Sequence, residues 1–261
     1  MIIRKSSQEI AKMRKAGEAV ARILTQIADM VAPGVTTEQL NRAAEELTRS
    51  MKLKPAFKGY CGYPAGLCTS VNEEVVHGIP GPRVLRQGDI IGLDFGVILD
   101  GYYGDAALTV PVGQVAPEVE KLLRVAREAL HLGIAQARSG GHVSDISRAI
   151  QQHVETNGFS VVRDFVGHGI GQAMHEDPQI PNYVSPLSGF DPRLKAGMTL
   201  AIEPMVNLGG YEVVVDPQDH WTVRTKDNRY SAHYEHTVLV TEGEPELLTA
   251  LPPGENEVWQ W

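Results

Sequence analysis

The stretch DIIGLDFGVILDGYYGDAALTVPV, residues 89–112, has the pattern of two β-strands joined by a tight turn. Apolar residues fill most of both arms, and Asp100-Gly101 between them is typical of two-residue hairpin turns. That turn places Asp105 opposite Gly96. Because strand side chains alternate between faces, Asp94 shares a face with Asp105, at a backbone distance of about 7–8 Å. A turn of even length preserves the shared face, and a turn of odd length abolishes it.

Two aspartates on one face of an apolar hairpin are costly to bury unless a cation lies between them. The pair alone leaves open the alternative of two exposed aspartates on a solvated face. Three other residues, which come later in the chain, favour a metal site instead. His168 is flanked by glycines in VGHGIG, and Glu203 and Glu235 lie in the strand-like runs TLAIEPMV and SAHYEHTVLV.

The predicted ligand set contains one histidine and four carboxylates. Two divalent cations would neutralise the four negative charges. Oxygen-rich sets favour Mn, Fe or Co over a structural zinc site. Two metal ions about 3.5–4 Å apart activate water near neutral pH, so the predicted chemistry is hydrolysis.

Helical patterns precede the hairpin. Ser6 and Glu9 form a predicted capping box at the start of one helix, which Pro33-Gly34 ends, and Thr36 and Gln39 form a second. The segment that follows, residues 55–68, is rich in Gly, Pro and Tyr and is predicted to be a loop.

After the hairpin, Pro117 is predicted to begin a helix that Gly140-Gly141 ends, and Ser144 to cap the next helix. From Phe159 onward the pattern is mostly that of strands. The order of elements predicts a single α/β domain, residues 1–261, with two related halves. A faint repeat at an offset of 107 residues supports the relation: Gly34, Thr37 and Glu38 recur as Gly141, Ser144 and Asp145.

Composition narrows the classes of function. The chain has 261 residues, is 43% hydrophobic and carries a formal net charge of −8, which disfavours nucleic-acid binding because phosphate contacts need clustered Lys and Arg. The two cysteines, Cys61 and Cys68, are expected to be reduced, as in the cytoplasm. The first residues lack the apolar run of a secretory signal, and the chain has no apolar stretch of about 18 residues that would span a membrane.

The ligand set and its surroundings resemble type I methionine aminopeptidase over nearly the whole chain. The family motifs are HGIP at 77–80, FVGHGIG at 165–171 and HEDP at 175–178. The resemblance implies the pita-bread fold, in which two pseudo-symmetric halves with antiparallel sheet and flanking helices surround a dinuclear site. It implies co-translational removal of the N-terminal methionine from proteins whose second residue is small. The ligands, in order, are Asp94, Asp105, His168, Glu203 and Glu235.

The resemblance also implies roles for single residues. Asp94 would bind one metal, Asp105 and Glu235 would bridge both, and His168 and Glu203 would complete the second site. Glu203 would also transfer protons in the hydrolysis. His175 would hydrogen-bond the scissile carbonyl oxygen, where charge develops, and His77 would contact the nitrogen side of the scissile peptide.

An apolar pocket for the methionine side chain is implied as well. The chain departs from common family members at Cys61, where a histidine is frequent, and at Met174, where an aromatic residue is frequent. Both departures concern pocket shape rather than metal ligands. Asn72 and Ser231 match positions that hold a monovalent cation in some members. The implied pocket residues are Phe57, Tyr60, Tyr63, Cys68, Met174 and Trp221, with His77 at the edge.

Two alternatives differ from this prediction. A prolidase or aminopeptidase P carries an extra N-terminal domain, whereas only two predicted helices and a loop precede this hairpin. A metal-free binding module would have substituted ligands, whereas all five are present. We expect a cytoplasmic monomer that acts on nascent polypeptide N-termini without binding nucleic acid or a membrane. The resemblance implies nascent chains as substrates and leaves association with the ribosome open, and the net charge offers no evident patch for ribosomal RNA.

Overall fold

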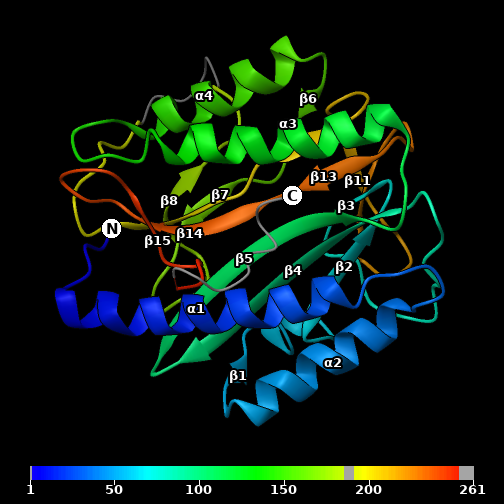
Figure 1. Cartoon of the computed structure of the whole chain (residues 1–261). Helices are drawn as coiled ribbons and strands as arrows, with labels where there is room; N and C mark the ends of the chain where they lie inside the picture. The colour runs from blue at the N-terminus through cyan, green and yellow to red at the C-terminus, as the bar shows by residue number, and fades with distance from the viewer. Residues whose placement is uncertain (1, 185–190, 253–261) are drawn as a thin grey trace.

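The computed structural model describes residues 2–184 and 191–252, and in these ranges helices lie beside a nine-stranded antiparallel sheet (Figure 1). The helices are α1 (Ser7–Asp29), α2 (Thr37–Ser50), α3 (Pro117–Ile134), α4 (Val143–Thr156) and the 3₁₀ turn η1 (Tyr60–Gly62). The strands are β1 (Lys54–Pro55), β2 (Leu67–Val71), β3 (Glu74–Val76), β4 (Ile90–Leu99), β5 (Tyr102–Pro111), β6 (Ser160–Val161), β7 (Gly167–Gly169), β8 (Glu176–Ile180), β9 (Thr199–Ile202), β10 (Met205–Asn207), β11 (Val213–Val215), β12 (Val223–Thr225), β13 (Ser231–His233), β14 (Glu235–Leu239) and β15 (Glu246–Leu247).

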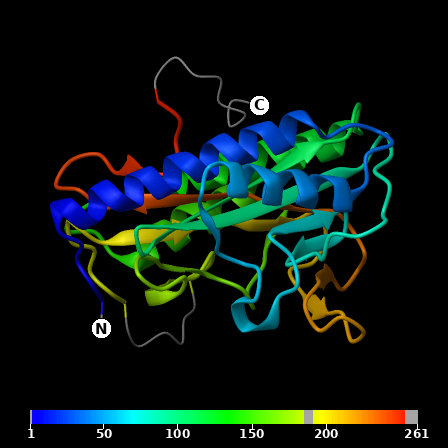
Figure 2. The ribbon, with the colours of Figure 1, turned by 90° about the horizontal axis from the view of Figure 1, so that it is seen from below.

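The largest sheet joins the two halves of the chain. Its strand order is β1-β4-β5-β14-β9-β7-β8, with β2 added beside β4 and β15 beside β14, and its pairings are antiparallel. The halves meet where β14 pairs with β5, with Glu235 opposite Ala107. Helices α1 and α2 lie beside the first half, and α3 and α4 beside the second (Figures 1 and 2).

The hairpin has the predicted register. Leu99 pairs with Tyr102 across the turn, and Asp105 lies opposite Gly96. The turn residues Asp100 and Gly101 have φ of 50° and 80°, the left-handed values of a two-residue turn that follows the twist of the strands. Asp94 and Asp105 therefore lie on one face of the sheet, which confirms the inference from alternation.

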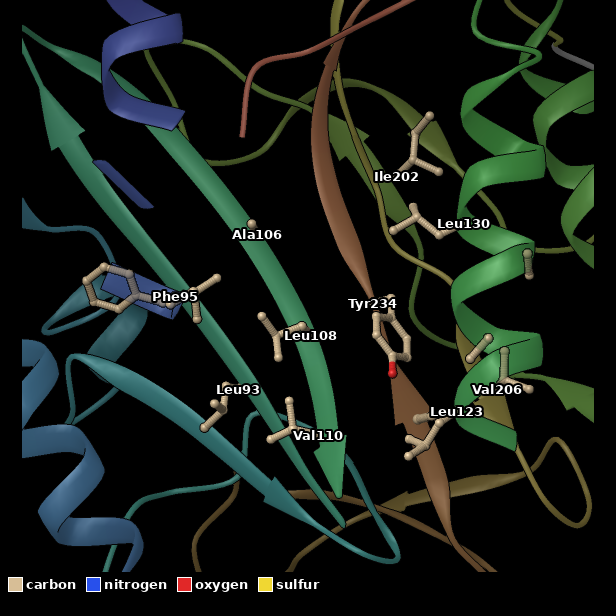
Figure 3. Close-up of a cluster of buried hydrophobic side chains, with 14 of the residues drawn as sticks. Leu93, Phe95, Ala106, Leu108, Val110, Leu123, Leu130, Ile202, Val206 and Tyr234 are labelled. Carbon is tan, nitrogen blue, oxygen red and sulfur yellow. The ribbon is translucent and has the colours of Figure 1, made fainter. Parts of the chain in front are cut away.

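The opposite face of the hairpin builds the core. Leu93 and Phe95 of β4 point away from the aspartates and pack with Leu108 of β5 (Figure 3). Helix α1 lies directly on β5, because a Cβ on Gly104 would come 2.7 Å from the carbonyl carbon of Ala16. Strands β4 and β5 thus have one face against the apolar core and one face toward the aspartates.

The predicted caps of the first two helices are confirmed. Ser6 with Glu9 and Thr36 with Gln39 both form capping boxes. Helix α1 ends at Asp29, before Pro33-Gly34. The predicted loop 55–68 also contains η1 and the start of β2.

The predicted cap of the fourth helix is wrong. His142 is the N-cap residue, and its backbone N–H donates to the Asp145 carboxylate at 2.9 Å. Ser144 lies in the first turn instead, where its N–H and hydroxyl donate to Asp191 at 3.0 and 2.7 Å. A distant partner therefore uses the hydroxyl that the local pattern assigned to the cap.

The repeat between the two halves is real, but its offset is 106 residues rather than 107. The N-cap residues Thr36 and His142 differ by 106, and each is followed by a helix of 14 residues. Gly34 and Gly140 match at the same offset, and both have a φ of 96°. The sequence match had aligned Gly34 with Gly141, the wrong glycine of the pair.

Candidate metal centre and adjoining pocket

All thirteen predicted site residues line one cavity of about 270 Å³. Asp94 comes from β4, Asp105 from β5, His168 from β7 and Glu235 from the start of β14, and Glu203 directly follows β9. These strands are neighbours in the sheet, so residues far apart in the sequence face the same space. The lining residues are Phe57, Tyr60, Cys61, Tyr63, Cys68, His77, Asp94, Asp105, His168, Met174, His175, Glu203, Trp221 and Glu235.

Carboxylate and imidazole groups converge at the floor of this cavity. Asp105, His168 and Glu235 are buried, and each offers a ligand atom within 4.8 Å of those of the other two. Glu203 joins them, with Oε1 3.5 Å from His168 Nε2 and with 14% of its side chain exposed. Donors so close together can share one bound cation or a pair of cations.

The electrostatics of the carboxylates fit bound cations. Burial raises the pKa of Asp94 well above its ordinary value, and the neighbouring Asp105 raises it further. Burial raises the pKa of Asp105 to about 7, and the pKa values of Glu203 and Glu235 also rise well above their ordinary values, chiefly through burial. Asp94 Oδ1, Asp105 Oδ1 and Glu235 Oε1 are buried without a hydrogen-bond partner. Divalent metal ions would supply the missing partner for these oxygens and stabilise the ionised forms.

The histidines of the cluster are held neutral. Burial lowers the pKa of His168 to about 4, so its ring is unprotonated near pH 7, as a metal ligand must be. A hydrogen bond of 2.8 Å joins His168 Nδ1 to the carbonyl of Gly169, which leaves Nε2 facing Glu203. This is the usual way in which a second partner orients a ligating imidazole.

His175 lies at the rim of the cluster. Its ring centroid is 4.4 Å from that of His168, and a 2.7 Å hydrogen bond joins its Nδ1 to the hydroxyl of Tyr60. Burial lowers the pKa of His175 as well. Tyr60, which the sequence placed only in the pocket wall, therefore also orients this ring.

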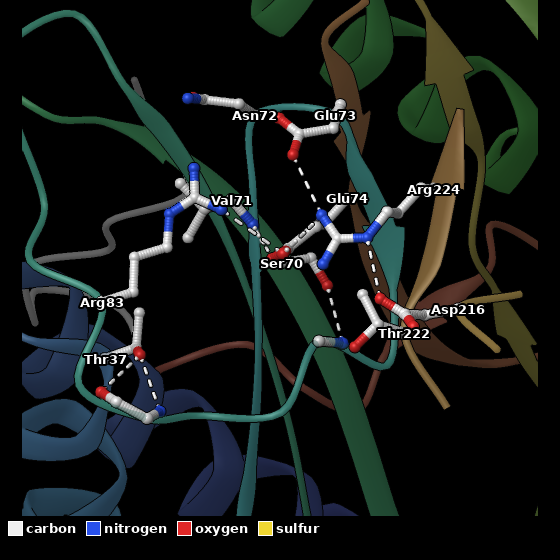
Figure 4. Close-up of polar contacts among 12 residues, drawn as sticks. Thr37, Ser70, Val71, Asn72, Glu73, Glu74, Arg83, Asp216, Thr222 and Arg224 are labelled. Atoms are coloured by element: carbon white, nitrogen blue, oxygen red, sulfur yellow. Dashed lines mark hydrogen bonds and ion pairs between the residues drawn. The ribbon is translucent and has the colours of Figure 1, made fainter. Parts of the chain in front are cut away.

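His77 lies on the loop after β3 and has a φ of 61°. Gly78 fixes that loop: its N–H donates to Ser70 Oγ at 3.2 Å, and its carbonyl accepts from the Thr69 N–H at 2.8 Å. Further along, Thr37 Oγ1 accepts from the Gly81 N–H at 2.9 Å (Figure 4). Burial lowers the pKa of His77 to about 4, so a neutral ring faces the cavity.

The remaining wall of the cavity is apolar and aromatic. Tyr63 and Trp221 meet edge to face with ring centroids 5.2 Å apart, and Tyr63, Ala65 and buried Cys68 form a small core with Phe57 and Ile79 packed against it. The Tyr63 hydroxyl donates to the Gly78 carbonyl at 2.9 Å, so the ring is fixed in place. Met174 is 2% exposed and lies beside the rim histidine. This apolar part of the cavity, lined by Phe57, Tyr63, Cys68, Met174 and Trp221 and called the slot below, therefore suits an apolar side chain.

Sequence reasoning missed His233. Its Nε2 is buried without a hydrogen-bond partner and lies 3.6 Å from Glu203 Oε2, and burial lowers its pKa to about 3. Its position two residues before Glu235 was an available signal. Cys61, noted only as a departure, lines the cavity mouth as an exposed free thiol.

The two residues matched to a monovalent cation site are also neighbours. The Asn72 carbonyl accepts from the Ser231 N–H at 2.9 Å, and both residues are buried. The Asn72 side chain donates from Nδ2 to Asp89 Oδ1 and accepts at Oδ1 from the Ile90 N–H, at 2.9 Å each.

Residues 11–242 match the model of metallopeptidase family M24. The chain belongs to metallopeptidase family M24. It is 51% identical over 251 residues to the methionine aminopeptidase of Clostridium perfringens, covering 96% of this chain and 100% of that protein. The crystal structure of methionine aminopeptidase from Thermotoga maritima superposes on this chain with a TM-score of 0.92 at 48% identity, covering 95% of this chain and 99% of that one.

The M24 likeness confirms the pita-bread fold that the sequence predicted. The prolidase from Pyrococcus horikoshii matches with a TM-score of 0.78 at 20% identity, and this chain covers 65% of it, a likeness of fold alone. As an M24 metallopeptidase the protein is a hydrolase with a cluster of candidate metal ligands. Across its described residues, none of the helices has the length and apolar character needed to cross a membrane.

Proposed function

We propose that this protein removes the N-terminal methionine from polypeptides by metal-dependent hydrolysis. The observation that carries the proposal is one cavity in which an apolar slot meets a cluster of buried carboxylates and histidines. The slot accounts for a methionine side chain, and the cluster accounts for hydrolysis of the bond that follows it. Relatives about half identical over their full length bear the same activity in their names.

Five residues would hold two divalent cations, with Mn, Fe or Co favoured by the oxygen-rich set. The bound ions would supply Lewis acidity and activate water near neutral pH. In this proposal Asp105 and Glu235, whose strands pair directly, would contribute their carboxylates to both ions. Asp94 would help to hold one ion, and His168 with Glu203 would help to hold the other.

The protein's own residues would then handle protons and developing charge. Glu203 has a raised pKa and touches the cluster, so it can accept a proton from attacking water and pass it to the leaving amine. The proposal uses the tautomer of His175 in which the Tyr60 hydroxyl donates to Nδ1 and Nε2 carries the proton, so that Nε2 can donate to the scissile carbonyl oxygen. His77, also neutral, would contact the nitrogen side of the scissile peptide.

Specificity would come from the slot and its rim. Phe57, Tyr63 and Trp221 give the long apolar wall that an unbranched thioether fits. The residue after methionine would lie beside the loop that bears Met174 and His175, where a small side chain would be favoured. Cys61 and Met174 lie in the wall of the cavity, so they would affect relative rates among substrates rather than the chemistry.

The cellular setting belongs to the proposal as well. We infer nascent chains in the cytoplasm as substrates, processed near the ribosome by a monomer of a single domain. Asn72 and Ser231 would lie at a monovalent cation site. Neither nucleic acid nor a membrane is part of the mechanism.

A peptide panel at fixed Mn²⁺ tests the proposal. Met-Ala, Met-Gly and Met-Ser peptides should be cleaved, Met-Leu and Met-Lys peptides poorly, and N-formylated peptides not at all. Xaa-Pro peptides test the rival prolidase activity in the same assay. Equal kcat/KM for Met-Ala and Met-Leu, or ready cleavage of a formylated peptide, contradicts the proposal. Metal content of protein purified without chelator separates an enzyme from a metal-free binding module.

A further inference from the structure

Lys5 is a cation buried within the fold, outside the cavity. Its Nζ lies 2.5 Å from Glu176 Oε2, and only 4% of the Lys5 side chain and 9% of the Glu176 side chain are exposed. The ion pair of Arg14 and Glu246 contrasts with it, since those side chains are 48% and 37% exposed. Because removing two charges from water is costly, a pair this buried needs a structural or functional reason.

The backbone fixes where Lys5 lies. Its N–H donates to the Gly197 carbonyl at 2.6 Å, and Arg4 Nε donates to the Ala196 carbonyl at 2.7 Å. The segment before α1 is thereby attached to the turn that leads into β9. With its backbone held there, Lys5 extends its ammonium group to Glu176, at the end of the loop between β7 and β8.

Glu176 connects Lys5 to that loop. Oε2 of Glu176 accepts a hydrogen bond from Lys5 Nζ. Its other oxygen, Oε1, accepts from the backbone N–H groups of Gln172 and Ala173 at 2.9 and 3.2 Å. The carboxylate therefore closes the loop of residues 171–176 on itself. This loop carries His175, the residue directly before Glu176.

The glycine that begins the loop makes room for this contact. A Cβ on Gly171 would lie 2.5 Å from Lys5 Cε and 2.6 Å from Glu176 Oε1, so a larger residue would push the pair apart. The last glycine of the GHGIG motif is thus explained by Lys5 rather than by a ligand. The loop is built around the ion pair.

We propose that Lys5 is a positioning residue for His175, acting through Glu176. This inference rests on the proposed function, because His175 acts on the scissile carbonyl only there. Without the ammonium group, Glu176 would be buried with an unbalanced charge and would turn toward water, releasing Gln172 and Ala173. A small displacement of a positioned catalytic group lowers kcat by up to roughly 10²-fold.

Lys5→Met tests the inference, because methionine matches the unbranched stem of lysine up to Cε and lacks the ammonium group. Arg14→Met is the matched control, since it breaks the exposed pair with Glu246. Both full-length variants are compared with wild type for bound metal, kcat and KM on a Met-Ala peptide. Lys5→Met should keep its metal and lose kcat by roughly 10- to 100-fold with KM within about threefold, whereas Arg14→Met should match wild type. A kcat within twofold of wild type for Lys5→Met overturns the proposal.

A double-mutant cycle separates positioning from general damage. In a His175→Ala background, Lys5→Met should lower kcat no further, because its effect passes through the missing ring. An equal loss in both backgrounds overturns the inference. If Lys5→Met fails to fold, the pair Lys5→Gln with Glu176→Gln, which leaves no buried charge, takes its place in the same cycle.

Amide hydrogen exchange keeps the inference testable if wild type cleaves no methionine peptide, a result that would reject the proposed function alone. The N–H groups of Gln172 and Ala173 should exchange faster in Lys5→Met than in wild type and at the wild-type rate in Arg14→Met. Unchanged exchange at both positions in Lys5→Met contradicts the proposed role.

Discussion

Replacing Asp105 with asparagine should stabilise the metal-free protein, even though it weakens metal binding. Asp105 is buried, its Oδ1 has no hydrogen-bond partner, and burial raises its pKa from 3.8 to about 7. The folded protein without metal therefore resists ionisation of this group. Asparagine has nearly the same shape and no charge, so it removes that conflict.

The magnitude follows from the pKa. A group whose pKa is higher in the folded than in the unfolded protein contributes stability that is present below the unfolded pKa and lost as the pH rises through the folded pKa. A rise from 3.8 to about 7 corresponds to about 4 kcal/mol lost at pH 8. In the absence of metal, the free energy of unfolding of Asp105→Asn should exceed that of wild type by about 4 kcal/mol at pH 8 and by about 1 kcal/mol at pH 4.5.

Urea unfolding in EDTA at the two pH values measures this difference. Buried histidines such as His168 and His233, whose pKa values are lowered, impose the opposite pH dependence, but they are present in both proteins and cancel in the comparison. Adding excess Mn²⁺ should reverse the order, because an ion that binds only the folded state stabilises wild type. A variant no more stable than wild type at pH 8 in EDTA, or an advantage independent of pH, refutes the reasoning.

Two further predictions concern the proposed roles. Glu235→Ala should lose both bound metal and activity, because its removal leaves two close cations without a bridge, and normal metal content by elemental analysis with near-normal kcat would remove Glu235 from the ligand set. His175→Ala should keep its metal and lose kcat by roughly 10²–10³-fold, as measured with saturating Met-Ala peptide, whereas a higher KM at unchanged kcat would restrict it to substrate binding.

The hairpin could be predicted from local sequence because its signals are local. Period-two alternation sets the faces, and Asp100-Gly101 sets the register, so the placement of Asp105 opposite Gly96 needed no tertiary information. The cap of α4 could not be predicted in this way. Ser144 has the chemistry of a cap residue, but Asp191, 47 residues away, takes its hydroxyl.

In the candidate site, too, some residues could be predicted from the local sequence and others could not. Carboxylates in apolar strands, such as Glu203 and Glu235, are unusual enough to be noticed in a sequence. The slot comes from loops and from an aromatic contact between Tyr63 and Trp221, 158 positions apart, and only the family resemblance brought these residues together in advance. The link between Lys5 and Glu176 spans 171 positions and leaves no local pattern.

The two-residue turn of the hairpin has a consequence for how this protein can diverge. Tips of surface hairpins ordinarily tolerate insertions and deletions. Here the turn at Asp100-Gly101 fixes which face Asp105 occupies, so one added residue that shifts the register would turn its carboxylate into the apolar layer under α1. Length at this tip should therefore vary only in steps of two among functional descendants, or not at all. An exposed turn would then be under selection for its residue count rather than for its side chains.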